Sequence, residues 1–175
     1  AADILWGCAL DWLTKFKLVP ETPAIKAYLG RMSDRLNLPQ RRAEDAALVT
    51  LSLERAADRS GDLTGAVYAR LFAAYPETEA LFVLDRDGQV RGAMLAHVFE
   101  TIFDFIGERR YADRFVGAEI VTHSGYGVAP EAFAAFFSLL RDEVRAACGP
   151  DWTLGMESAW KGLLAELSRV VVDQP

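Results

Sequence analysis

The chain has 175 residues, 51% of them hydrophobic, so it is long and apolar enough to bury the core of one domain. Its formal net charge of −6 argues against a general affinity for nucleic acid or for an anionic membrane. Two cysteines, Cys8 and Cys148, are too few for a disulfide-stapled secreted domain. No apolar run reaches the length of a membrane span and no signal-peptide pattern opens the chain, so we expect a cytoplasmic protein.

The first 40 residues predict two helices followed by a break. Apolar residues recur at helical spacing over residues 3–17, and Pro20 ends that helix. A second helix is expected to start at Pro23, because proline is tolerated in the first helical turn. We expect a boundary at residues 36–40, since Pro39 disfavours helix at the residue before it.

The rest of the chain has the same helical periodicity and almost no alternating apolar and polar runs, which predicts an all-α fold. Helices are expected at residues 42–59, 63–75, 89–106, 111–123 and 130–147. A last helix, capped by Asp151 or Thr153, is expected to end near residue 172. Pro76 opens a short helical turn that leads to Phe82.

Several motifs occur in a definite order along residues 41–173. Residues 68–78 read Tyr-Ala-Arg-Leu-Phe-Ala-Ala-Tyr-Pro-Glu-Thr, and Phe82 follows Pro76 by six residues. His123 precedes Pro130 by seven residues, within the stretch Thr-His-Ser-Gly-Tyr-Gly-Val-Ala-Pro-Glu-Ala-Phe. The last helix opens with Asp-Trp-Thr at 151–153 and carries Ala-Trp at 159–160. In order and spacing, these residues resemble the globin family, and within it the bacterial single-domain haemoglobins and flavohaemoglobins.

The resemblance implies a globin-like fold around haem b, with His123 as the ligand of the iron. Such an imidazole is neutral, and its other nitrogen needs an acceptor, which the carbonyl of Glu119 or Ile120 would supply. His97 lies beside the apolar stripe of its helix, and we interpret it as a surface or rim histidine. An iron bound by both histidines is the alternative.

On the distal side, the resemblance implies that Tyr68 faces the gas ligand and donates a hydrogen bond to it, and that Phe82 stacks on the haem. The register of the following helix stays open. In one register Val90 and Met94 face the ligand, whereas in the other Arg91 and Leu95 do so, and Gln89 is a third option. An arginine here would instead reach a haem propionate.

The proximal side departs from the flavohaemoglobin pattern. Those proteins carry a tyrosine ten residues after the haem histidine, where this chain has Phe133. Phe133, Phe137 and Val128 are still expected to line the haem. The missing hydroxyl argues against strong oxygen activation, and a chain that ends at Pro175 leaves no room for flavin and nicotinamide domains, so turnover would need a separate reductase.

Residues 1–36 carry a second resemblance, to two helices in the C-terminal domain of glutathione transferases, through Ala-Asp-Ile-Leu near the start and Pro-Ala-Ile-Lys-Ala-Tyr-Leu at 23–29. The capping partner expected three residues before Asp3 falls outside the chain, as does the glutathione-binding half. We therefore expect no transferase activity. We expect a helical hairpin, which packs on the globin part or on a second copy as a homodimer, with a plain amphipathic hairpin as the alternative.

The function expected from these resemblances is reversible binding of dioxygen or another diatomic gas, for storage, scavenging or sensing, rather than catalysis. Two alternatives stay open. The first is a haem enzyme of the nitric-oxide dioxygenase or peroxidase type, and the second is a haem-free globin-like interaction or signalling module.

Overall fold

The structure of the chain is a computed structural model that describes residue 14 and residues 22–172, the side chains of residues 33–37 and 172 excepted. Every regular element in these ranges is helical, which confirms the all-α prediction. The helix predicted at residues 3–17 lies outside the described residues, apart from residue 14. The chain divides into two compact units, Ala1–Glu44 and Asp45–Pro175.

Helix α2, Pro23–Ser60, begins at the predicted proline and passes through Pro39 without a break. The Thr22 hydroxyl accepts a hydrogen bond from the Ile25 N–H group at its start. The interruption predicted at residues 36–40 is therefore wrong. A proline inside a helix costs about 3 kcal/mol, but strong helix formers follow it, and Gln40 donates to Glu44 one turn later at 3.0 Å.

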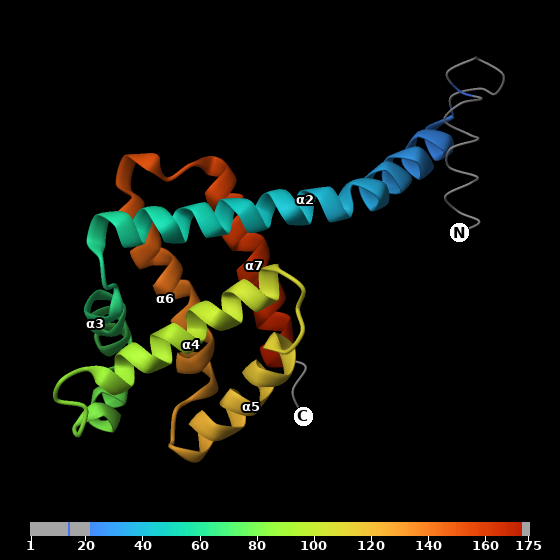
Figure 1. Cartoon of the computed structure of the whole chain (residues 1–175). Coiled ribbons are helices and arrows are strands. Elements are labelled where there is room, and N and C mark those ends of the chain that lie inside the picture. Colours follow the sequence, from blue (N-terminus) through green and yellow to red (C-terminus); the bar gives the residue numbers. More distant parts are fainter. Residues whose placement is uncertain (1–13, 15–21, 173–175) are drawn as a thin grey trace. The chain divides into compact units, whose positions relative to one another are not determined.

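The second unit contains the C-terminal part of α2 and all the later helices (Figure 1). These are α3 (Thr64–Ala74), the 3-10 helix η1 (Pro76–Phe82), α4 (Gln89–Ile106), α5 (Ala112–Gly125), α6 (Pro130–Cys148), the 3-10 turn η2 (Gly149–Asp151) and α7 (Leu154–Val172).

Local signals in the sequence set these boundaries. Pro76 and Pro130 begin their helices as predicted. The Thr153 hydroxyl accepts a hydrogen bond from Met156 N–H at 3.1 Å, so Thr153 is the side chain that caps α7. Gly88 precedes α4 in the left-handed region, with φ 76°, where a side chain would be strained.

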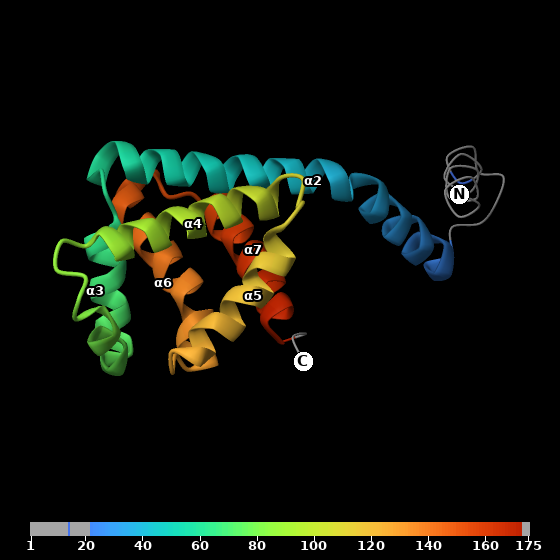
Figure 2. The ribbon, with the colours of Figure 1, turned by 60° about the horizontal axis from the view of Figure 1, so that its bottom comes forward.

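The core of the second unit is built by packing helices from distant parts of the chain. Helix α3 packs against α4 and α6, and α5 packs against α4, α6 and α7. The C-terminal half of α2 crosses one end of α6 and α7, as both views show (Figure 2). No helix within the described ranges has both the length and the apolar character needed to cross a bilayer.

A buried polar group joins α2 to α6 and α7. The Ser52 hydroxyl accepts a hydrogen bond from the Trp160 indole N–H at 2.8 Å and donates to the Val49 carbonyl at 2.6 Å. The Ser52 carbonyl accepts a hydrogen bond from the Cys148 thiol at 3.3 Å. Both Ser52 and Trp160 are fully buried, so this serine satisfies an indole that has no access to water.

Replacing Ser52 with alanine is expected to lower the free energy of unfolding by about 1–3 kcal/mol, because it leaves the buried Trp160 N–H group unpaired. Urea unfolding followed by tryptophan fluorescence measures this change. Ser168→Ala, which removes an exposed hydroxyl bonded to its own helix, is the control and should change stability little. Equal effects of the two substitutions would contradict this role of Ser52.

Candidate functional site

A cavity of about 450 Å³ lies in the second unit, with walls from α3, η1, α4, α5, α6 and the loop between α5 and α6. Its size is in the range of ligand pockets, and aromatic rings form much of its lining. The aromatic residues that line it are Tyr68, Phe82, Phe115, Tyr126, Phe133, Phe136 and Phe137. Such a cavity suits a flat, largely apolar ligand.

His123 lines this cavity from the last turn of α5. Its Nδ1 lies 2.8 Å from the carbonyl oxygen of Glu119, one turn earlier. Because a carbonyl can only accept a hydrogen bond, the neutral ring carries its proton on Nδ1, and the lone pair on Nε2 is free to bind a ligand. One of the two carbonyls predicted to orient this ring therefore does so. Phe133 packs edge-on against the imidazole, with 5.1 Å between ring centroids.

Tyr68 lines the same cavity from α3, and only 3% of the residue is exposed. Its ring contacts Phe72, Phe82 and Phe136, at centroid distances of 5.9, 5.2 and 5.5 Å. In the part of the chain that the structure describes, no group forms a hydrogen bond with its hydroxyl. Burial raises the pKa of the phenol. Arg91 lowers this pKa and Asp85 raises it, both to smaller extents, so the hydroxyl stays protonated and can donate a hydrogen bond.

Helix α4 presents one face to the cavity, through Val90, Met94, His97, Val98 and Thr101. Of the three registers left open for this helix, the structure brings the one with Val90 and Met94 to the cavity, and neither Gln89 nor Arg91 lines it. Leu95 lies in the hydrophobic core with 2% exposure. Arg91 points to the side, where its Nε donates to the Asp85 carboxylate at 2.8 Å.

Asp85 explains this orientation of Arg91. Its carboxylate also accepts hydrogen bonds from the backbone N–H groups of Val90 at 2.9 Å and Arg91 at 3.1 Å, and so caps α4. Burial by itself would raise the pKa of Asp85, but the hydrogen bonds from Arg91 and the backbone outweigh it, so the pKa is lowered. The carboxylate therefore stays charged and holds the arginine beside Asp85, so that Arg91 is not among the residues that line the cavity.

His97 also lines the cavity, although the sequence pattern places it beside the apolar stripe of its helix. The residue is exposed, and its ring lies 6.2 Å from that of Phe115 on α5, edge to face. This position agrees with the rim histidine that we predicted. Ile102, further along the same helix, lies in the hydrophobic core.

The structure thus brings most of the predicted site residues together. Those that line the cavity are Tyr68, Phe82, Val90, Met94, His123, Val128, Phe133 and Phe137. Sequence reasoning missed several others, namely Thr78, Asp85, Thr101, Phe115, Tyr126, Ala132 and Phe136. Helical spacing was the available signal for some of them: Thr101 follows His97 by four residues, and Phe136 follows Ala132 by four.

A family model described as Globin matches residues 65–171, which run from the first turn of α3 to the last turn of α7. The match covers more than half of the chain and includes His123, Tyr68 and the rest of the cavity lining. The chain belongs to the globin family. Comparison with curated proteins and with solved structures gave no match.

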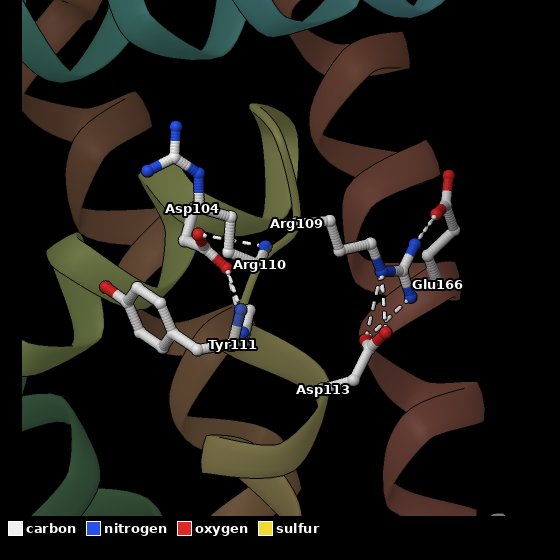
Figure 3. A network of polar contacts seen from close by, with 7 residues as sticks. Asp104, Arg109, Arg110, Tyr111, Asp113 and Glu166 are labelled. Carbon is white, nitrogen blue, oxygen red and sulfur yellow. Dashed lines mark hydrogen bonds and ion pairs between the residues drawn. The ribbon is translucent and has the colours of Figure 1, made fainter.

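In this globin, the helix that carries His123 is held at its other end by Asp104 of α4 (Figure 3). The Asp104 carboxylate accepts hydrogen bonds from the N–H groups of Arg110, Tyr111 and Ala112 at 3.1, 2.9 and 2.8 Å. Burial alone would raise the pKa of Asp104, but these three bonds and the charge of Arg110 lower it. Asp104 therefore caps α5 from a neighbouring helix.

Arg109 connects the same corner of the globin to α7. Its guanidinium bonds Asp113 through Nε at 3.0 Å and Glu166 through Nη1 at 2.8 Å, as Figure 3 shows. It also lies 3.9 Å from the centroid of the Phe105 ring. Arg109 adopts φ 54°, a left-handed conformation that is unfavourable for a side-chain-bearing residue, so these contacts offset backbone strain.

Replacing Asp104 with alanine is expected to lower the midpoint of thermal unfolding at neutral pH. It is also expected to make that midpoint fall less steeply as the pH is lowered. The folded pKa of Asp104 lies below the unfolded value of about 3.9, so its contribution is present above that value and is lost as pH falls through the folded pKa. Thermal unfolding of both proteins between pH 7 and the acid limit of the fold tests this. The midpoints should converge at low pH.

Asp58→Ala, at an exposed position of α2, is the control for a general effect of removing negative charge. A constant difference between wild type and the Asp104 variant at every pH would argue against the charged cap.

Proposed function

We propose that this globin binds haem b in the cavity, with His123 as the ligand of the iron, and that it reversibly binds dioxygen or another diatomic gas there. The observation that carries the proposal is the pairing of two groups in one apolar cavity. His123 has Nδ1 occupied by Glu119 and Nε2 free, and Tyr68 has a buried hydroxyl that no described group satisfies.

The residues of the cavity fit haem in chemistry as well as in size. Neutral imidazole is a common haem ligand, and the contact with the Glu119 carbonyl fixes the tautomer with the proton on Nδ1 and limits rotation of the ring. The rings of Phe82, Phe133 and Phe137 supply flat apolar surface on which a macrocycle can pack. Bound haem would supply an iron with a free coordination position for a diatomic gas.

Tyr68 is the strongest hydrogen-bond donor that we assign to the gas. Its raised pKa keeps the phenol protonated, and its three aromatic neighbours limit where the ring can move. The ring contact with Phe82 joins this donor to a residue that we propose to pack on the haem. The hydroxyl would therefore slow release of a ligand that gains negative charge when it binds.

Phe133, which packs against His123, favours reversible binding over catalytic turnover. Phe133 contacts the imidazole with a ring that has no hydroxyl to donate. Consumption of nitric oxide with an added reductant and a separate reductase tests the enzymatic alternative. Rapid conversion to nitrate would favour the dioxygenase over the binding protein.

The finer parts of the proposal concern the type of globin, its location and its assembly. We propose a globin of the bacterial single-domain type, active in the cytoplasm, with residues 41–173 as the globin part. Residues 1–36 would form a helical hairpin that lacks glutathione-binding activity and mediates packing, including a homodimer. Light scattering of the full chain and of a chain starting at residue 41 tests the last point.

Absorption spectra of the purified protein after haem titration test the main proposal. We expect a Soret band that saturates at one haem per chain and shifts when carbon monoxide is added to the reduced protein. Absence of the band would overturn haem binding and favour the interaction module. A band that does not respond to carbon monoxide would overturn gas binding.

A further inference from the structure

Two groups of Glu119, its backbone carbonyl and its carboxylate, lie close to the imidazole of His123. Its backbone carbonyl lies 2.8 Å from Nδ1, and its carboxylate oxygen Oε2 lies 3.4 Å from the same nitrogen. Both groups come from one residue, one helical turn before the histidine. The Glu119 side chain is one-third exposed and lines the cavity, so its charge is partly shielded from water.

The carbonyl and the carboxylate do different things to the ring. The carbonyl accepts a hydrogen bond from Nδ1–H and fixes the tautomer. The carboxylate adds negative charge beside the same N–H bond, which draws the proton away from the ring and makes Nε2 a better electron donor. Phe133, which packs edge-on against the ring, carries no charge that would oppose this effect.

We infer that Glu119 is a positioning residue whose carboxylate strengthens electron donation by His123. The inference rests on the proposed function, in which His123 binds the iron. A more basic imidazole stabilises the oxidised iron relative to the reduced iron, so the carboxylate lowers the midpoint potential. In this chain the negative charge beside the imidazole comes from α5 itself, without a hydroxyl at residue 133.

Glu119→Gln separates the two effects, because it removes the charge while it keeps the backbone carbonyl and the shape of the side chain. At a fixed potential we expect the ratio of reduced to oxidised protein to rise about tenfold, which corresponds to about 59 mV for one electron. Glu119→Ala should give a shift of similar size. Glu54→Gln, at an exposed position of α2, is the matched control and should leave the potential unchanged.

A shift in Glu119→Ala alone would mean that packing, and not charge, sets the potential, and it would overturn the inference. An unchanged potential in both variants would overturn it as well.

A second measurement uses the haem-free protein. In ¹⁵N NMR spectra, His123 should be protonated on Nδ1 in both wild type and Glu119→Gln, because the carbonyl contact remains. The Nδ1–H proton resonance should move upfield in the variant as the charged neighbour is lost. If it does not move, the inference fails whether or not haem binds. If it moves but no Soret band forms in either protein, the proposed haem binding and the effect on the iron are both wrong. The effect of the Glu119 carboxylate on the imidazole would then still be supported.

Discussion

Replacing His123 with alanine is expected to lower the affinity for haem by more than about 100-fold, beyond the 10- to 100-fold effect typical of losing an outer-shell partner of a metal ligand. The reason is that, among the described residues that line the cavity, only His123 has an imidazole whose Nδ1 bonds a carbonyl and whose Nε2 is free to bind a ligand. Haem titration followed at the Soret band, with competition by an apo-globin of known affinity, measures the loss.

His97→Ala is the matched control, because it removes the same side chain from the rim of the same cavity. It should leave the five-coordinate spectrum of the reduced protein in place. Added imidazole should restore a histidine-like spectrum to the His123 variant, because the substitution opens space beside Phe133. A normal spectrum in His123→Ala without imidazole would refute the ligand assignment, and loss of that spectrum in His97→Ala would favour binding by both histidines.

Replacing Tyr68 with phenylalanine is expected to speed release of dioxygen by about 10- to 100-fold. The substitution removes one hydrogen bond to a ligand that carries negative charge, worth about 1.5–3 kcal/mol, and about 1.4 kcal/mol corresponds to a factor of ten. The ring contacts with Phe72, Phe82 and Phe136 remain available, so the packing of the site is preserved. Stopped-flow displacement of dioxygen by carbon monoxide measures the release rate.

Tyr126→Phe is the matched control for Tyr68→Phe. Tyr126 also lines the cavity, but 72% of the residue is exposed, so its hydroxyl can bond water and its removal should change the release rate little. Release of carbon monoxide, which gains less charge on binding, should change less than release of dioxygen in Tyr68→Phe. An unchanged dioxygen rate would mean that Tyr68 serves only to pack the core.

The cavity depends on contacts that also stabilise the helices around it. Asp85 caps α4 and holds Arg91 aside, so the arginine does not enter the space beside Val90 and Met94. Asp104 caps α5, whose last turn carries His123. The two carboxylates have lowered pKa values for the same reason, because backbone N–H groups favour their charged forms. Protonation of Asp85 and Asp104, as pH falls through their lowered pKa values, should therefore weaken both walls of the site.

Much of the secondary structure and part of the site could be predicted because the signals for them are local. Helix α4 has the predicted bounds, Gln89–Ile106, since a turn with glycine precedes it and Gly107 follows it. Pro76 and Pro130 mark helix starts through their own geometry. The contact between His123 and Glu119 is also local, because residues four apart lie on the same face of a helix.

The prediction at Pro39 failed because a local signal was outweighed by its neighbours. The missing hydrogen bond of one proline is a fixed cost, whereas a long helix gains stability from each residue that extends it.

The sequence by itself determined an all-α chain, the starts of most of its helices and the candidate residues His123 and Tyr68. Only the tertiary structure decided which face of α4 meets the cavity, since a shift of one residue turns a helix by about 100°. That choice depends on Asp85, Leu95 and the core, which are partners that helical periodicity cannot identify. The tertiary structure also joined Ser52 to Trp160, because such contacts form only when helices distant in sequence pack together.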